Sequence, residues 1–260
     1  MQMKRIVVKV GSNVLTRQDG TLDVTRMSAL TDQVAQLHKS GKEVILVSSG
    51  AVASGRSEIT PSSALDEVSS RQLYSAIGQV KLINRYYDLF RSHGIICGQV
   101  LTTKDSLSRP GQYENQQHCI EVMLSCGVIP IINENDTISL TELMFTDNDE
   151  LSGTMARMMG ADVLVILSAI DGMYDGDPSD PDSHLIREIR QDQAGNIESC
   201  ISSSKSSAGR GGMKTKCNVA LSLSASGIPV VIANGKRDDI LLSVLDGSDV
   251  PCTWFVTRMK

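Results

Sequence analysis

A lysine stands inside the first apolar run of the chain. Lys9 interrupts the segment Ile6–Val10, which is otherwise apolar and predicts a buried strand ended by Gly11-Ser12. An ammonium group that is buried without a partner is costly. Lysines in strands are usually edge charges, but this setting favours a functional lysine that meets an anion.

A second basic segment lies near the other end of the chain. Gly209-Arg210-Gly211-Gly212 precedes a helical pattern that carries Lys214 and Lys216, and no acid occurs between Glu198 and Asp238. A glycine-rich loop that opens a helix offers backbone N–H groups and a positive dipole to an anion. The glycines alone would also suit a flexible turn. Together with the two lysines they favour an anion cradle.

Acids and amides gather between these basic segments. The stretch between Arg109 and Arg157 holds eight acids and no Lys or Arg. It includes Asn133-Glu134-Asn135-Asp136, which by itself suits a turn, and Asp147-Asn148-Asp149, which suits a helix N-cap. Three such residues exceed what one cap needs, so the second segment is a candidate for ligand binding.

Two other segments match known ligand loops only superficially. Gly50–Ser57 is one residue from the phosphate-loop pattern, with Arg56 where that pattern has Lys, but its interior Ala-Val-Ala-Ser suits the first turn of a helix. Asp175–Asp182 lacks the glycine at the sixth position and the terminal glutamate of a calcium loop. We interpret the first match as accidental and the second segment as part of a solvated surface loop over Asp171–Asp182, with a lid as an alternative.

Strands and helices alternate along the chain. Such alternation predicts an α/β fold around a mainly parallel sheet, in which ligands bind beyond the carboxyl ends of the strands. The apolar patterns predict strands at Arg5–Val10, Glu43–Ser48, Ile95–Leu101, Val128–Ile132, Asp162–Leu167, Pro229–Ala233 and Cys252–Val256. They predict helices at Thr25–Ser40, Ser69–Ser92, Gln112–Cys126, Glu150–Met159, Met213–Ser226 and Asp239–Leu245.

Composition narrows the class of protein. A net charge of −5 disfavours a diffuse nucleic-acid binder, and no apolar run approaches the length of a membrane span or a signal-peptide core. The six cysteines form no CxxC pair, which argues against a zinc site and against a disulfide scaffold. We expect free thiols in a cytoplasmic protein without nucleic-acid or membrane partners.

The chemical segments together resemble the amino acid kinase family. The resemblance rests on Val8-Lys9-Val10-Gly11-Ser12, Val47-Ser48-Ser49-Gly50-Ala51, Ile132-Asn133-Glu134-Asn135-Asp136, Asp147-Asn148-Asp149 and Gly211-Gly212-Met213-Lys214-Thr215-Lys216. Their order spans nearly the whole chain. The Asn-Glu-Asn-Asp and Asp-Asn-Asp segments are most similar to the members that use ATP to phosphorylate the side-chain carboxylate of L-glutamate, the first step of proline biosynthesis.

The resemblance implies a three-layer αβα sandwich over residues 1–260, with an amino-acid lobe at about 1–165 and a nucleotide lobe at about 166–260. It implies that Lys9 and Lys216 contact the transferred phosphoryl group and that Asp149 orients them. The implied glutamate contacts are Ser49, Gly50, Asn133, Asp136 and Asn148. The implied nucleotide contacts are Lys9, Gly11, Ser168, Ala169, Arg210, Gly211, Gly212, Met213, Lys214, Thr215 and Lys216, and the N–H groups of Gly11 and Gly50 are expected to help at the phosphates.

The resemblance also implies Mg²⁺ with ligands that the sequence does not identify, a homodimer or homotetramer, and feedback inhibition by proline.

Three features of the chain depart from the pattern of the family. Many such members carry a C-terminal PUA domain, which would not fit before Lys260, so we expect none. Ser168-Ala169 stands where many members of the family have Thr-Asp, so we expect the backbone to make the nucleotide contact there. Arg210 stands where such members have a small residue, and its side chain either contacts a phosphate or faces solvent.

Two alternatives stay open at this point. The chain resembles, less specifically, members of the family that act on aspartate, N-acetylglutamate, carbamate or UMP. UMP is least compatible with the acids of 133–149, which would repel a second phosphate. A binding protein that kept the fold and lost turnover is a hypothesis of another class, and Lys9, Lys216 and Asp149 together argue against it.

Overall fold

The computed structural model describes residues 3–139, 145, 147–190 and 212–257. Within them an eight-stranded sheet forms the centre, and every neighbouring pair of its strands is parallel except β9 and β10. Its order is β3 (Cys97–Thr102), β4 (Ile129–Glu134), β2 (Glu43–Ser48), β1 (Arg5–Val10), β5 (Val163–Ser168), β9 (Val230–Asn234), β10 (Cys252–Phe255), β8 (Glu188–Ile189).

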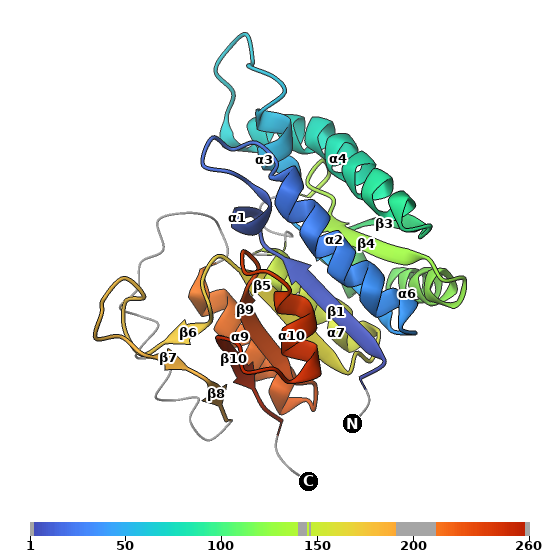
Figure 1. Cartoon of the computed structure of the whole chain (residues 1–260). Helices are drawn as coiled ribbons and strands as arrows, with labels where there is room; N and C mark the ends of the chain where they lie inside the picture. Colours follow the sequence, from blue (N-terminus) through green and yellow to red (C-terminus); the bar gives the residue numbers. More distant parts are fainter. Residues whose placement is uncertain (1–2, 140–144, 146, 191–211, 258–260) are drawn as a thin grey trace.

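Helices cover both faces of the sheet, which confirms the three-layer αβα prediction (Figure 1). One face packs against α2 (Val24–Lys39), α4 (Glu67–Ser92) and α10 (Ile240–Asp246). The other face packs against α6 (Pro110–Ser125), α7 (Asn148–Met158) and α9 (Met213–Ala225). Short helices follow several strands: α1 (Ser12–Leu15), α3 (Ala51–Arg56) and α5 (Lys104–Ser108).

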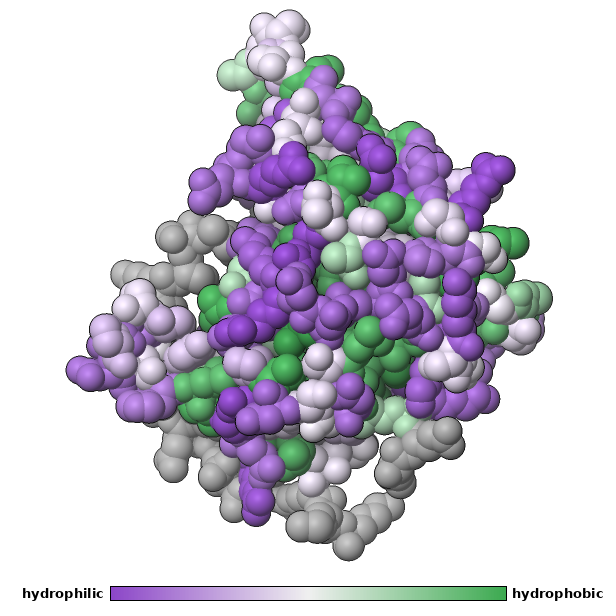
Figure 2. Space-filling view, in the orientation of Figure 1, coloured by the Kyte–Doolittle hydropathy of each residue, from purple (hydrophilic) through white to green (hydrophobic). Residues whose placement is uncertain are grey.

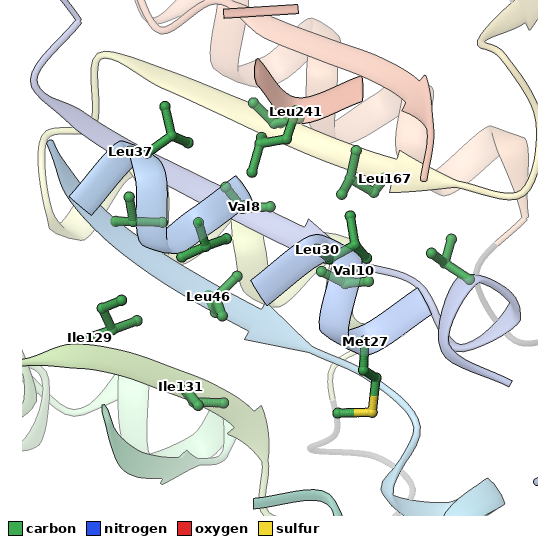
Figure 3. Close-up of a cluster of buried hydrophobic side chains, with 14 of the residues drawn as sticks. Val8, Val10, Met27, Leu30, Leu37, Leu46, Ile129, Ile131, Leu167 and Leu241 are labelled. Carbon is green, nitrogen blue, oxygen red and sulfur yellow. The ribbon is translucent and has the colours of Figure 1, made fainter. Parts of the chain in front are cut away.

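The core under α2 follows from sequence spacing. The side chain of Asp23 caps α2 by accepting from the N–H of Arg26, and the apolar side chains that follow at three- and four-residue steps face the sheet. Figure 3 shows Met27, Leu30 and Leu37 of this helix over β1 and β2, in the same cluster as Val8, Val10 and Leu46. Because β1 alternates, Val8 and Val10 join this cluster, whereas Val7 joins the core on the opposite face.

Two glycines bring α3 and α4 into backbone contact. A Cβ atom on Gly55 would lie 1.8 Å from the carbonyl oxygen of Tyr74, and one on Gly78 would lie 1.8 Å from that of Ala51. Only glycine fits at both positions. The prediction that the segment after Gly50 is helical is confirmed, and this helix is fixed on α4.

The segment after β5 differs from the prediction of a simple loop. Residues Met173–Tyr174 (β6) pair antiparallel with Leu185–Ile186 (β7). The expected loop over Asp171–Asp182 therefore contains the first strand of a small hairpin and most of the connection to its second strand. The hydroxyl of Thr253 holds it to β10 by accepting from the N–H of Met173 at 2.8 Å and donating to the carbonyl of Ile186 at 2.6 Å.

The outer surface is polar over much of the face in view. Figure 2 shows hydrophilic side chains over most of that face, interrupted by small apolar patches. None of the helices in the described ranges combines the length and the apolar character that crossing a bilayer requires.

Candidate functional site

Lys9, Asp149 and Lys216 form one buried ionic cluster. Lys9 shares the face of β1 with Val7, and this face meets α7 and α9, which carry Asp149 and Lys216. The Nζ of Lys9 lies 2.6 Å from Asp149 Oδ1, and the Nζ of Lys216 lies 2.9 Å from Asp149 Oδ2. Asp149 is 0% exposed, and the two lysines are 5% and 7% exposed. Residues expected to act together are therefore brought together from three distant parts of the chain.

The cluster holds two cations on one anion. Burial lowers the pKa of Lys9, and the nearby Lys216 lowers it further while Asp149 opposes the shift. Burial alone would raise the pKa of Asp149, but the two ammonium groups outweigh it and hold that pKa below its ordinary value. One buried carboxylate thus keeps two ammonium groups in place with a net positive charge, which suits an anionic ligand.

Asp147 is the N-cap residue of α7. Its Oδ1 accepts from the N–H groups of Asp149 and Glu150, at 2.8 and 3.1 Å, as an N-cap. Its Oδ2 is buried and has no hydrogen-bond partner among the described residues. Burial, reinforced by the charge of Asp149, raises the pKa of Asp147 to about 6. The plain cap considered from the sequence is therefore present, and it carries a second oxygen that the cap does not use.

Replacing Asp147 with asparagine should stabilise the fold at neutral pH and have little effect near pH 4. Asparagine keeps the capping oxygen and carries no charge. Protonation of Asp147 favours the folded state below its unfolded pKa of 3.8, and this contribution is lost as the pH rises through about 6. The free energy of unfolding of Asp147→Asn should exceed that of the wild type by on the order of 3 kcal/mol at pH 7.5. Urea titrations at pH 4, 6 and 7.5 measure it, and a difference that does not change with pH would contradict it.

A row of amides crosses the carboxyl ends of β4 and β2. The Nδ2 of Asn148 lies 2.9 Å from both Ser49 Oγ and Asn133 Oδ1. Asn133 in turn donates to Gln79 Oε1 at 2.8 Å. Three residues predicted from the sequence are thus in direct contact. Gln79 was missed, because its position on α4 gives no sign that it faces β4.

An acidic pair lies beside this row, and the sequence prediction of a turn there is partly wrong. Asn133 and Glu134 are the last residues of β4, and Asn135 and Asp136 follow the strand. Arg71 of α4 bridges the two acids: its Nε lies 2.7 Å from Asp136 Oδ1, and its Nη2 lies 3.1 Å from Glu134 Oε2. Burial raises the pKa of Glu134, although the N–H of Phe145 donates to it at 2.9 Å. Arg71 was also missed, since a charged residue on a helix usually faces solvent.

On the expected nucleotide side, glycines shape the wall. A Cβ on Gly11 would lie 3.2 Å from the carbonyl oxygen of Leu167 and 3.5 Å from the Nζ of Lys9. The N–H of Gly11 already donates to the carbonyl oxygen of Leu167 at 3.1 Å, so Gly11 contributes space to the wall, and a contact of its amide with a phosphate stays a prediction. Gly50 has a φ of 106°, which favours glycine, where the chain turns into α3.

The cradle predicted before α9 is described only in part. Gly212 caps α9, and its carbonyl oxygen accepts from the N–H groups of Thr215 and Lys216. Lys214 is exposed, and neither it nor Thr215 is among the described residues that line the cavity below. Arg210 and Gly211 lie outside the described residues.

A cavity of about 920 Å³ connects these groups. Its wall is continuous from the acidic pair and Arg71, past Lys9, to the strand end of β5. Most of the predicted site residues line it: Lys9, Gly11, Ser49, Gly50, Asn133, Asp136, Asn148, Ser168, Ala169, Met213 and Lys216. Asp149 does not line it but lies behind the two lysines, which fits a residue that positions them.

Comparison with known proteins agrees with this geometry. A model of the amino acid kinase family matches residues 4–234. The glutamate 5-kinase of Bacteroides thetaiotaomicron is 62% identical over 98% of this chain and 71% of its own length. That of Chlorobaculum tepidum is 46% identical over 99% and 70%, and that of Symbiobacterium thermophilum is 39% identical over 95% and 94%.

Solved structures share the fold at low sequence identity. Carbamate kinase from Giardia lamblia bound to AMP-PNP matches with a TM-score of 0.70 at 17% identity, over 99% of both chains. UMP kinase from Ureaplasma parvum matches with a TM-score of 0.66 at 17% identity, over 99% of this chain and 100% of its own. By the family model and by these relatives, the chain belongs to the amino acid kinase family, in the group of the glutamate 5-kinases.

Proposed function

We propose that the protein transfers the γ-phosphoryl group of ATP to the side-chain carboxylate of L-glutamate. The products are L-glutamyl 5-phosphate and ADP, and the reaction is the first step of proline biosynthesis. One observation carries the proposal beyond the sequence relationship. Lys9 and Lys216, both held by Asp149 behind them, line a cavity that carries at one end the acids and amides that an amino acid requires.

The reaction brings two anions together, and the two lysines relieve their repulsion. A carboxylate oxygen attacks the γ-phosphorus while the bond to the β-γ bridging oxygen breaks and ADP leaves. No general base is needed, because the glutamate side chain is already ionised at neutral pH. Lys9 and Lys216 stabilise the charge on the transferred group, and Asp149 holds both ammonium groups at the cavity wall.

We assign the other residues by their place in the cavity. Asp136 supplies a carboxylate for the substrate ammonium, and Ser49, Gly50, Asn133 and Asn148 line the path from there to Lys9. At the opposite end, the space left by Gly11, together with Ser168, Ala169 and Met213, suits the nucleotide. We keep Arg210, Gly211, Gly212, Lys214 and Thr215 as proposed nucleotide contacts around the start of α9.

Mg²⁺ fits this site as an ion that arrives with ATP. The described residues hold no group of three or more His, Cys, Asp or Glu able to bind a metal. Mg²⁺ in phosphotransferases takes most of its ligands from phosphates and water, with one or two carboxylates. The Oδ2 atom of Asp147 is the carboxylate oxygen at the cavity that suits it. When bound, the ion neutralises phosphate charge.

We also propose a cytoplasmic homodimer or homotetramer that proline inhibits at or near the glutamate site. The carboxylate of Asp136, which we assign to the substrate ammonium, supports a shared site, because proline offers an α-carboxylate and a cationic nitrogen to the same end of the cavity. Light scattering measures the assembly. A proline titration at several glutamate concentrations measures the inhibition.

Incubation with L-glutamate, ATP and Mg²⁺ in the presence of hydroxylamine should yield glutamyl hydroxamate. Hydroxylamine traps the acyl phosphate, and ADP should appear in equal amount. Reactions without Mg²⁺ are the control for the metal. Aspartate, N-acetylglutamate, carbamate and UMP, tested in the same ADP-release assay, are expected to be poor substrates. No product from glutamate, with turnover of one of these four, would overturn the proposal.

A further inference from the structure

The cations at the cavity are unevenly distributed. Lys9, Arg56, Arg71 and Lys216 are the basic side chains among the described residues that line it. Lys9 and Lys216 are both held by Asp149, where the phosphoryl group is expected. Arg56 is exposed, with its guanidinium carbon 5.5 Å from the centre of the Tyr74 ring. Arg71 is therefore the cation placed among the groups that we assign to the amino-acid substrate.

Arg71 is fixed by neighbours that are themselves fixed. Its side chain is 20% exposed and contacts Asp136 and Glu134, whose side chains are 8% and 4% exposed. Asp136 also accepts from the hydroxyl of Ser75 at 3.3 Å. Glu134 is held from the other side by the N–H of Phe145. A guanidinium can contact a second carboxylate while it keeps the first, because its five donors form a planar fork.

The strand order sets the distance between the two charged ends. β4 and β1 are separated by β2, and neighbouring strands lie about 4.8 Å apart, so the ends of β4 and β1 are about 10 Å from each other. An amino acid with a short side chain spans this gap with its side-chain carboxylate toward Lys9. Its α-carbon then lies near Asp136 and Arg71. An α-carboxylate brought beside Asp136 and Glu134 without a cation would be repelled.

We propose that Arg71 is a specificity-determining residue that binds the α-carboxylate of the substrate, while the Asp136 it contacts binds the α-ammonium. This assignment rests on the proposed function, since it names how the same cavity recognises the end of glutamate that does not react. The ion pair between Arg71 and Asp136 is then a preformed counterpart of the zwitterion at the α-carbon.

A substrate that lacks only the α-carboxylate isolates this contact. 4-Aminobutyrate keeps the ammonium and the reactive carboxylate of glutamate. In the wild type, kcat/KM for glutamate should exceed that for 4-aminobutyrate by roughly 100-fold or more, because the site pairs a buried charge with the missing group. In Arg71→Ala, kcat/KM for glutamate should fall by roughly 100-fold, and the value for 4-aminobutyrate should change by less than about 3-fold. Where turnover of 4-aminobutyrate is too slow, its inhibition constant against glutamate replaces kcat/KM.

Two further variants complete the test. Arg71→Lys keeps the charge without the planar fork and should lie between wild type and Arg71→Ala for glutamate, and it serves in place of Arg71→Ala if thermal unfolding shows that variant to be unfolded. Arg26→Ala is the matched control, because Arg26 is also 20% exposed and ion-paired, to Asp238, but does not line the cavity. Arg26→Ala should leave kcat/KM for both glutamate and 4-aminobutyrate unchanged.

The outcomes are distinct. Equal losses for glutamate and 4-aminobutyrate in Arg71→Ala would mean that Arg71 only supports Asp136, and they would overturn the inference. Unchanged use of glutamate would overturn it as well. Phosphorylation of glutamate by the wild-type protein supports the proposed function whatever Arg71→Ala does. The role of Arg71 can therefore be wrong while the proposed function is right.

Discussion

Replacing Lys9 with alanine should lower kcat by about 100- to 1000-fold and leave the fold intact. Its ammonium group lies 2.6 Å from a fully buried carboxylate and at the wall of the cavity, where charge develops on the transferred phosphoryl group. Losing one preorganised donor at such a position commonly costs a factor of this size. Glutamyl hydroxamate formation at saturating ATP and glutamate measures kcat, and circular dichroism checks the fold.

Lys4→Ala is the matched control for this variant. Lys4 precedes the same strand, but its side chain is 71% exposed and pairs with Glu43 on the surface. It should leave kcat unchanged. Wild-type turnover in Lys9→Ala would remove Lys9 from the mechanism and return the ionic cluster to a purely structural role.

Replacing Asp149 with asparagine should both abolish most activity and destabilise the fold, by about 3–5 kcal/mol. The change leaves the ammonium groups of Lys9 and Lys216 buried beside a neutral amide, and breaking a buried pair by removing one partner costs about this much. Because Asp149 does not line the cavity, its loss should act on kcat through the displaced lysines. Urea titration and hydroxamate formation measure the two effects.

The combination with Lys9→Met separates these effects. Removing one of the two ammonium groups that lose the charge of Asp149 should recover part of the stability lost in Asp149→Asn, while activity stays low. Asp66→Ala, at an exposed helix cap, is the control and should cost much less stability than Asp149→Asn, without loss of activity. Additive losses of stability in the double variant would show that Asp149 does not act through the lysines.

The parts of the fold that depend on local pattern could be predicted. The strands at Arg5–Val10 and Glu43–Ser48 were placed to the residue, because continuous apolar runs bounded by glycine or charge leave little choice. The order of strands in the sheet could not be predicted, since β4 inserts next to β2 and β5 next to β1 through contacts between distant segments. The single-domain organisation with two lobes stays a prediction.

The site divides in the same way. Lys9 could be recognised because it is a charged residue in an otherwise apolar strand. Asp149 could be recognised because it belongs to a run of three Asp and Asn residues, where a helix cap requires only one. Arg71 and Gln79 could not be recognised, because they are two of many polar residues on α4 and nothing in the sequence distinguishes them. Their role depends on which side of α4 turns toward β4, and this is decided by the packing of Leu82, Tyr86 and Phe90 farther along the helix.

The glycine contacts between α3 and α4 restrict how the substrate range of this protein can be altered. Gly50 at the start of α3 and Arg71 on α4 belong to helices whose backbones touch at Gly55 and Gly78. A shift of α4 that lengthened the amino-acid end would carry the turn at Gly50 with it and disturb the reacting end. Enzymes engineered for longer acids would therefore have to gain room by trimming side chains at the cavity wall, with both helices left where they are.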